Sequence, residues 1–216
     1  MRTCISLPNV CELPFPDTKS NEDMRCPEML VRLFLEEYTQ PGDVVLDPFA
    51  GYATTLRVAE AMGRIPYGVE ANRERAEKAR CLINHKYNLI LGDSRDIRTM
   101  GLPPIDFSIT SPPGMKQTEH SNAIREHIRA KGNYLQYLTD MKAIYQQIAA
   151  LLLPHGKAVI EVSNLKTAHG VTPLAWDVAL VVSEVLEFLG EIVVRWEPGA
   201  GRGYDHSYCL IFGKRT

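Results

Sequence analysis

Residues 44–51 read VVLDPFAG, and this stretch decides the fold. A short apolar run ends in an Asp-Pro elbow, the pattern of a strand buried in a parallel sheet. A helical pattern over about 53–62 follows, closed by Gly63, and IPYGVE at 65–70 is the next strand pattern. A strand, a helix and a second strand in this order predict a parallel pair joined by a right-handed crossover.

The same alternation continues on both sides of this unit. We predict further strands at 87–93, 105–110, 157–163, 191–197 and 207–214, and helices at 28–38, 72–84, 134–153 and 174–189. The last two strands have only a short glycine-rich turn between them, so they must pair antiparallel. This α/β pattern resembles the class I (Rossmann-like) methyltransferase fold: a seven-stranded, mostly parallel sheet in the order 3-2-1-4-5-7-6, with the last strand antiparallel and helices on both faces.

Length and charge narrow the class of protein. The chain has 216 residues, 45% of them apolar and 23% charged, so we expect one domain over 1–216, with the Pro-rich residues 1–25 as an extended lead-in. Lys and Arg number 24 against 26 Asp and Glu, and the formal charge of −2 excludes a general polycation that grips nucleic acid. We find no apolar run long enough for a membrane helix and no secretory signal, so a cytoplasmic location is expected.

The five cysteines indicate neither a disulfide framework nor a zinc site. Their number is odd, and no pair has the CxxC spacing. We expect reduced thiols in or near the core.

Two strand ends predict where a ligand binds. Ligands of open α/β sheets lie beyond the carboxyl ends of the strands, at the point where the winding reverses. Here that point lies between the strand that ends at Asp47–Gly51 and the one that ends in TSPPG at 110–114. These turns are about 60 residues apart in the chain, and the topology makes them neighbours in space.

Several motifs, taken together, resemble one family. They are PGDVVLDPFAGYATT at 41–55, GVEANRERAEKA at 68–79, GDSRD at 92–96 and TSPP at 110–113, with MRCPEMLVRLF at 24–34 and HSYCLIFGK at 206–214. Over roughly 24–214 the chain resembles the amino-methyltransferases, which transfer a methyl group from S-adenosylmethionine to an exocyclic amino nitrogen of a base. SPP is similar to the catalytic motif of the cytosine-N4 DNA enzymes, so the resemblance implies DNA methylation, as in restriction–modification.

The resemblance implies a set of cofactor residues. DPFAG contributes Asp47, facing the cofactor's ammonium group, and Ala50 and Gly51, where the backbone approaches closely. Asp47 could instead cap the next helix. Phe49 packs on the cofactor, on the target base or in the core. The segment that contains Pro27 is similar to the one that covers the methionine end.

Two further carboxylates follow the next two strands. Glu70 is expected to accept both ribose hydroxyls, with a solvent-exposed strand-end charge as the alternative. Asp93 is expected to accept a hydrogen bond from the adenine amino group, and its alternative is a helix cap or turn former.

Ser111, Pro112 and Pro113 are the predicted catalytic residues. The Ser111 hydroxyl and the Pro112 carbonyl could each accept one N–H of the base amine, which holds its nitrogen in line with the methyl carbon. The two prolines stiffen the turn and remove competing N–H donors. A plain Pro-Pro loop is the alternative.

Two positions depart from the family. Gly114 stands where the family usually has an aromatic residue that stacks on the flipped base, and the Gly-x-Gly elbow has become Gly51-Tyr52-Ala53. Tyr52 could supply the missing ring. These changes concern the recognition of the target base and not the cofactor.

The polar segment 114–133 is the predicted substrate lid. Its basic residues Lys116, Arg125, Arg129 and Lys131 are suited to phosphate contacts, which Arg202 could extend; an ordinary solvated loop is the alternative. For Tyr134 and Tyr137 we expect packing before base stacking.

The chain offers little room for a separate recognition region. The target is therefore short, is read by a protein partner, or is single-stranded or RNA, since an amine inside a duplex requires base flipping. We expect a DNA methyltransferase; an RNA base methyltransferase and a cofactor-binding, non-catalytic subunit are the alternatives.

Overall fold

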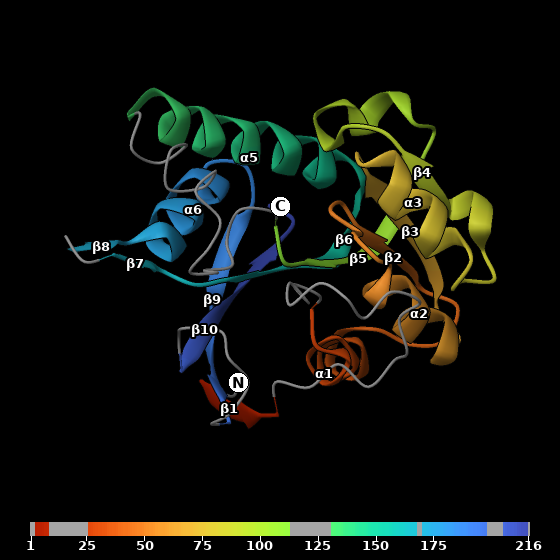
Figure 1. The fold of residues 1–216 in the computed structure, drawn as a ribbon, viewed down its shortest axis with the longest axis horizontal. Helices are drawn as coiled ribbons and strands as arrows, with labels where there is room; N and C mark the ends of the chain where they lie inside the picture. The colour runs from red at the N-terminus through yellow and green to blue at the C-terminus, as the bar shows by residue number, and fades with distance from the viewer. Residues whose placement is uncertain (1–2, 9–25, 113–130, 168–169, 198–204, 216) are drawn as a thin grey trace.

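The fold is known from a computed structural model, which describes residues 3–8, 26–112, 131–167, 170–197 and 205–215 (Figure 1). The strands are β1 (Cys4–Leu7), β2 (Val44–Asp47), β3 (Ile65–Glu70), β4 (Leu89–Leu91), β5 (Ile105–Thr110), β6 (Leu152–Val162), β7 (Leu165–Thr167), β8 (Gly170–Thr172), β9 (Glu187–Trp196) and β10 (His206–Gly213). The helices are α1 (Glu28–Tyr38), α2 (Thr54–Ala61), α3 (Arg73–Arg80), α5 (Lys131–Leu151) and α6 (Leu174–Ser183), with 3-10 turns η1 (Lys86–Asn88) and η2 (Ser94–Thr99).

The main sheet has the predicted winding. Its order is β1-β9-β10-β6-β5-β2-β3-β4. Counted along the chain from β2, this is 3-2-1-4-5-7-6 with one added edge strand. β10 pairs antiparallel with both β6 and β9, while the other pairs are parallel. The predicted order and the reversed final strand are confirmed.

The added strand corrects two predictions. The sheet has eight strands and not seven, and residues 4–7 are not a plain lead-in but pair in parallel with β9, Cys4 opposite Val193. Leu7 is buried in the same apolar cluster as α1 and β9. A four-residue strand before a proline has too little alternation to be separated from an extended segment by sequence.

Several element boundaries also differ from the predictions. The helix predicted over 174–189 ends at Ser183, and β9 already begins at Glu187, where Phe188 packs on Phe212 of β10 with ring centroids 5.4 Å apart. β6 begins at Leu152, because Leu152 pairs with Ile105 before a bulge. α5 begins at Lys131, so the last three residues of the predicted lid are helical. The β7–β8 hairpin was not predicted.

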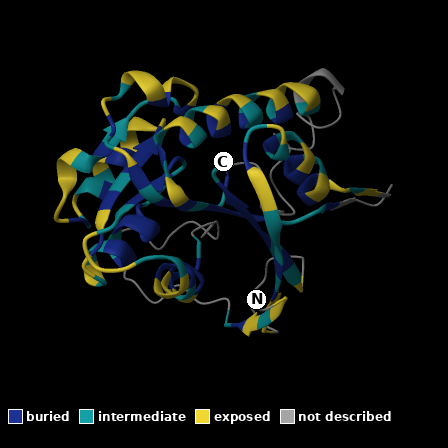
Figure 2. Ribbon diagram, turned by 180° about the vertical axis from the view of Figure 1, so that it is seen from behind, coloured by how far each residue is buried: buried dark blue, intermediate teal, exposed yellow. Residues whose placement is uncertain are grey.

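Helices cover both faces of the sheet (Figure 1). α5 and α6 pack over one face in a cluster that includes Leu46, Tyr145 and Val178. α1 and α2 pack over the other face, in a cluster with Phe34 and Val45. Figure 2 shows buried residues along the strands and exposed residues on the outer sides of the helices. This is the class I methyltransferase fold.

Within the described residues, no helix is long and apolar enough to cross a bilayer.

The described cysteines differ in exposure. Cys209 is buried in β10, as expected, but Cys4 and Cys81 are exposed, so the prediction of thiols in or near the core is wrong for these two.

Candidate functional site

The two predicted turns lie side by side. β2 and β5 pair in parallel, with Val45 opposite Phe107. At their carboxyl ends the Thr110 hydroxyl donates a hydrogen bond of 2.6 Å to Oδ1 of Asp47. Ser111, which follows Thr110, therefore stands beside the Asp47–Gly51 turn, 64 positions later in the chain. The topology that predicted this convergence is confirmed.

Asp47 is a buried carboxylate with several donors around it. Its side chain accepts hydrogen bonds from the Phe49 amide (2.9 Å), from Thr110 and from Thr55. Burial nevertheless raises the pKa of Asp47 above its ordinary value, and the charge of Glu70 adds to this increase. The N-cap of α2 is Ala53, so Asp47 does not cap that helix. It instead closes an Asx turn at the start of the elbow, the turn of residues 47–53 between β2 and α2.

The backbone of the elbow turns back on itself at two residues. Gly51 has φ 54° and Ala53 has φ 61°, both in the left-handed region. The third position of the altered Gly-x-Gly motif thus keeps a conformation that glycine adopts freely and alanine does not. The Ala50 amide donates to the Val69 carbonyl at 2.9 Å, which holds the elbow against the end of β3.

Glu70 lies at the end of β3 and faces this elbow. Its Oε2 accepts from the Gly51 amide at 2.9 Å and its Oε1 from the Asn72 amide at 2.7 Å. The side chain is buried, with the Arg75 guanidinium 3.9 Å away. The alternative of a strand-end charge in solvent is therefore wrong. Two buried carboxylates, Asp47 and Glu70, end adjacent strands.

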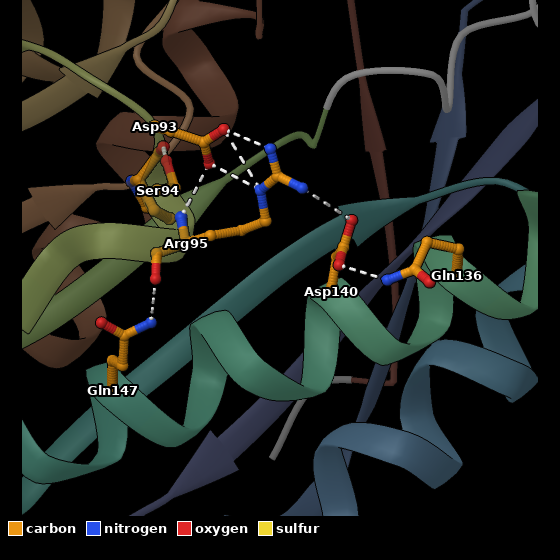
Figure 3. Close-up of polar contacts among 7 residues, drawn as sticks. Asp93, Ser94, Arg95, Gln136, Asp140 and Gln147 are labelled. Carbon is orange, nitrogen blue, oxygen red and sulfur yellow. Dashed lines mark hydrogen bonds and ion pairs between the residues drawn. The ribbon is translucent and has the colours of Figure 1, made fainter.

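Asp93 follows β4 and carries out a structural task. It is the N-cap of η2, accepting from the Arg95 amide at 2.9 Å, and its carboxylate also binds the Arg95 side chain (Figure 3). These hydrogen bonds from Arg95 lower the pKa of Asp93. The neighbouring Ser94 hydroxyl donates to the Pro48 carbonyl and so links this turn to the elbow. The cap is observed, and the adenine contact stays a prediction.

The Ser111 hydroxyl is available for a ligand. Its oxygen is shielded from solvent and has no hydrogen-bond partner among the residues that the structure describes. Pro112 beside it is buried. A shielded acceptor without a partner costs stability unless something fills the position. An incoming amine would supply the missing partner.

The remaining predicted residues divide into two groups. Pro113, Lys116, Arg125, Arg129 and Arg202 lie outside the described residues, and of Lys131 only the helical backbone is described. Pro27 is buried at the start of α1, and Phe49 packs against the α5 cluster, in line with the core alternative. Tyr52 is half-buried.

Packing of the two tyrosines is confirmed. Tyr137 is half-buried and packs against the apolar cluster between the sheet and helices α5 and α6, and the Tyr134 hydroxyl donates to Asp177 of α6.

Sequence reasoning missed four residues of this region. Thr110 and Thr55 bond Asp47, and Arg95 binds Asp93. Tyr145 of α5 is fully buried. Burial is the main reason that its pKa is raised, and the nearby charge of Asp47 raises it further. The contact of Arg95 was predictable, because a donor two residues after an N-cap aspartate commonly bonds its carboxylate. The other contacts join segments that are distant in the chain, and no local pattern indicates them.

Part of the sequence is similar to known DNA methylases. Residues 14–80 match the N6/N4 DNA methylase family model. Over 58 residues the chain is 45% identical to the DNA adenine methyltransferase YhdJ of Escherichia coli K12, which is 27% of this chain and 20% of that protein. The chain thus matches about a fifth of the length of this relative.

Solved structures support the fold over most of the chain. TrmN from Thermus thermophilus superposes with a TM-score of 0.64 over 88% of this chain and 49% of that one, at 17% identity. A methyltransferase from Pyrococcus furiosus superposes with a TM-score of 0.59 over 91% and 87%, at 16% identity. The chain therefore has the fold of these methyltransferases. Within residues 14–80 the sequence is similar to the N6/N4 DNA methylase family.

Proposed function

We propose that this chain is an S-adenosylmethionine-dependent methyltransferase that modifies an exocyclic amino group of a DNA base. Ser111 favours cytosine N4 over adenine N6, since the family resemblance associates SPP with the cytosine enzymes. The proposal includes a single catalytic domain over 1–216 and a cytoplasmic location. One observation carries it: the Asp47–Thr110 hydrogen bond, which brings the elbow of β2 beside Ser111.

The described residues fit the cofactor. S-adenosylmethionine carries an ammonium group, a sulfonium and two ribose hydroxyls, and the elbow offers two buried carboxylates, Asp47 and Glu70. Glu70 keeps an acceptor position on each oxygen besides its two amide bonds. Bound there, the cofactor supplies an electrophilic methyl group on a positively charged sulfur.

The chain's own residues would act on the base. The amine of cytosine or adenine is a weak nucleophile because its lone pair is delocalised into the ring. The Ser111 oxygen and the Pro112 carbonyl accept its two N–H groups, so that the nitrogen becomes more tetrahedral and points at the methyl carbon. With the cofactor held by Asp47 and Glu70, this nitrogen would accept the methyl group from the sulfur and would then lose one proton to water.

Transfer of a labelled methyl group tests the proposal. The protein is incubated with labelled S-adenosylmethionine and DNA, and the nucleosides are identified by mass spectrometry. N4-methylcytosine is the expected product. N6-methyladenine alone would refute the choice of base.

An RNA base amine is the second candidate, favoured by Gly114 at the position of the usual stacking residue. Labelled RNA with unlabelled DNA in the same assay would establish it. Cofactor binding without transfer to either polymer, unchanged by Ser111→Ala, would instead indicate a non-catalytic subunit that positions a protein partner.

The Ser111→Ala variant separates catalysis from binding. Removing one acceptor from the amine should lower the turnover number by about 10²-fold, while the affinity for the cofactor stays within about twofold. Glu70→Ala is the matched opposite: cofactor affinity should fall. Equal losses in both parameters for Ser111→Ala would contradict the role given to its hydroxyl.

A further inference from the structure

The Arg95 side chain occupies the carboxylate that is expected to recognise adenine. Its Nε lies 3.1 Å from both oxygens of Asp93, and one terminal nitrogen donates to Oδ2 at 2.7 Å (Figure 3). The Arg95 backbone amide donates to Oδ1 at 2.9 Å. The two oxygens of Asp93 thus receive three N–H groups from a single residue, and the one Nε–H is shared between them.

These contacts engage both oxygens of Asp93. A carboxylate offers about four acceptor positions, and three N–H groups of Arg95 are bound to them. Glu70 differs, because each of its oxygens accepts only one backbone amide. An adenine amino group that binds Asp93 therefore competes with the Arg95 guanidinium for the same two oxygens.

A second carboxylate stands ready for that guanidinium. The other terminal nitrogen of Arg95 lies 3.7 Å from Oδ2 of Asp140, on α5. The Gln136 amide already binds Oδ1 of Asp140, which leaves Oδ2 for Arg95 (Figure 3). A rotation of the Arg95 side chain therefore exchanges one carboxylate for another.

The backbone under Arg95 is held in place during such an exchange. The Gln147 amide donates to the Arg95 carbonyl at 2.7 Å, and its oxygen accepts from the Arg98 amide at 2.9 Å. η2 is thereby tied to α5, and only the side chain of Arg95 needs to move.

We propose that Arg95 is a positioning residue of the cofactor site. When adenine binds, the Arg95 guanidinium leaves Asp93 and pairs with Asp140, and this exchange sets the affinity for adenosine-containing ligands. This inference rests on the proposed function, since it takes Asp93 as the adenine acceptor. Both ion pairs are partly exposed, with 57% of the Arg95 side chain accessible, so the competition is modest. Its removal should change a dissociation constant by about two- to fivefold.

Calorimetric titration with S-adenosylhomocysteine tests the exchange, because this ligand keeps the adenosine but carries no sulfonium charge. Arg95→Ala should bind it about two- to fivefold more tightly than the unmodified chain. Asp140→Asn should bind it more weakly, because the alternative partner of Arg95 is lost. The double variant should behave like Arg95→Ala, since without Arg95 the charge of Asp140 no longer matters.

A ligand without the amino group separates this competition from a general charge effect. S-inosylhomocysteine has a carbonyl where adenine has its amine, so Arg95→Ala should not tighten its binding. Arg73→Ala, which removes an exposed Arg73–Glu77 pair on α3, is the control and should leave both affinities unchanged.

Three results would overturn the inference. Equal or weaker binding of S-adenosylhomocysteine by Arg95→Ala would mean that Arg95 does not compete. Equal tightening for both ligands would assign the effect to charge alone. If the unmodified chain binds no S-adenosylhomocysteine, the proposed function fails and the inference with it, whereas binding with the wrong response to Arg95→Ala refutes the inference only.

Discussion

Ala53 holds a backbone conformation that its side chain disfavours. Among the described residues it is the non-glycine residue with positive φ, and it is fully buried between the elbow and α2. A left-handed conformation costs alanine about 1–2 kcal/mol. The chain accepts this cost at the turn that presents Gly51 to Glu70, which indicates that the shape of the turn is maintained although the second glycine of the motif is gone.

Glycine at position 53 should therefore be tolerated unusually well. Ala53→Gly loses a buried methyl group but relieves the left-handed strain, and we expect the free energy of unfolding to change by less than about 1 kcal/mol. Ala59→Gly is the matched control, since Ala59 is equally buried within α2. Chemical denaturation should show Ala59→Gly to be less stable than Ala53→Gly by about 1 kcal/mol. Equal losses would mean that Ala53 is not strained.

Asp47 should make cofactor binding sensitive to acid. Its pKa is raised by burial, so protonation begins at a higher pH than for an exposed aspartate. Only the ionised form attracts an ammonium group; affinity should fall as the pH drops through the raised pKa. Asp47→Asn should weaken binding about tenfold at neutral pH and abolish this acid step.

Protonation of Asp47 has the opposite effect on the stability of the fold. Because the folded-state pKa lies above the unfolded value, protonation on acidification favours the folded protein at this residue. Titrations of S-adenosylhomocysteine between pH 4 and 8 measure the binding step. Asp43→Asn, in the turn before β2, is the control. An acid step that survives in Asp47→Asn would assign it to another group.

The sequence predicted the carboxylates of the site but not their partners. Asp47 and Glu70 directly end apolar runs, and local alternation places strand ends reliably. The bonds from Thr110 to Asp47 and from Arg95 to Asp140 join segments 63 and 45 positions apart, as 110 − 47 and 140 − 95 show. Such contacts depend on side-chain rotamers after the sheet has formed, which periodicity does not describe.

At the scale of elements, a glycine in β3 lets the elbow approach. A Cβ on Gly68 would lie 2.8 Å from the Cβ of Ala50 and 2.9 Å from a methyl group of Leu56. Any side chain there must displace the elbow or α2. The position of Gly51 relative to Glu70 is thus coupled to the absence of a side chain at Gly68.

Gly68→Ala should damage both stability and cofactor binding. We expect the free energy of unfolding to fall by about 1–3 kcal/mol, with weaker cofactor binding because the Gly51–Glu70 bond is disturbed. Gly156→Ala is the matched control: its Cβ would lie 2.8 Å from the Asp106 carbonyl, near the start of β5. It should destabilise the fold and leave cofactor affinity unchanged. Equal effects of both variants on affinity would contradict the coupling.

Element boundaries show where sequence reasoning ended. The order of seven strands was predictable because strands and helices alternate along the chain, and right-handed crossovers permit few sheet topologies for such a chain. β1 and the first residues of β9 were not, since each gains its structure from a neighbour: Cys4–Leu7 from β9, and Phe188 from Phe212. Tertiary pairing overrode a weak local pattern in both cases.

For the whole molecule, charge limits how nucleic acid can be held. The formal net charge is −2, so attraction to phosphates must come from a local set of cations. The predicted set contains Lys116, Arg125, Arg129 and Lys131. These residues follow Ser111 in the sequence, and the last of them is the first residue of α5. A protein of this kind should show a limited salt dependence of binding, unlike one that neutralises phosphates over its entire surface.

The salt dependence of DNA binding measures that set directly. Each phosphate contact contributes about −0.9 to the slope of log K against log salt concentration, so four contacts should give a slope near −3.6 on duplex DNA. Replacing Lys116 and Arg125 with Gln should reduce its magnitude by about 1.8. Arg73→Gln with Lys86→Gln, two exposed residues of α3 and η1, is the charge-matched control and should leave the slope unchanged. Similar reductions in both double variants, measured by fluorescence anisotropy, would show that binding follows total charge and would remove the segment 114–133 from the interface.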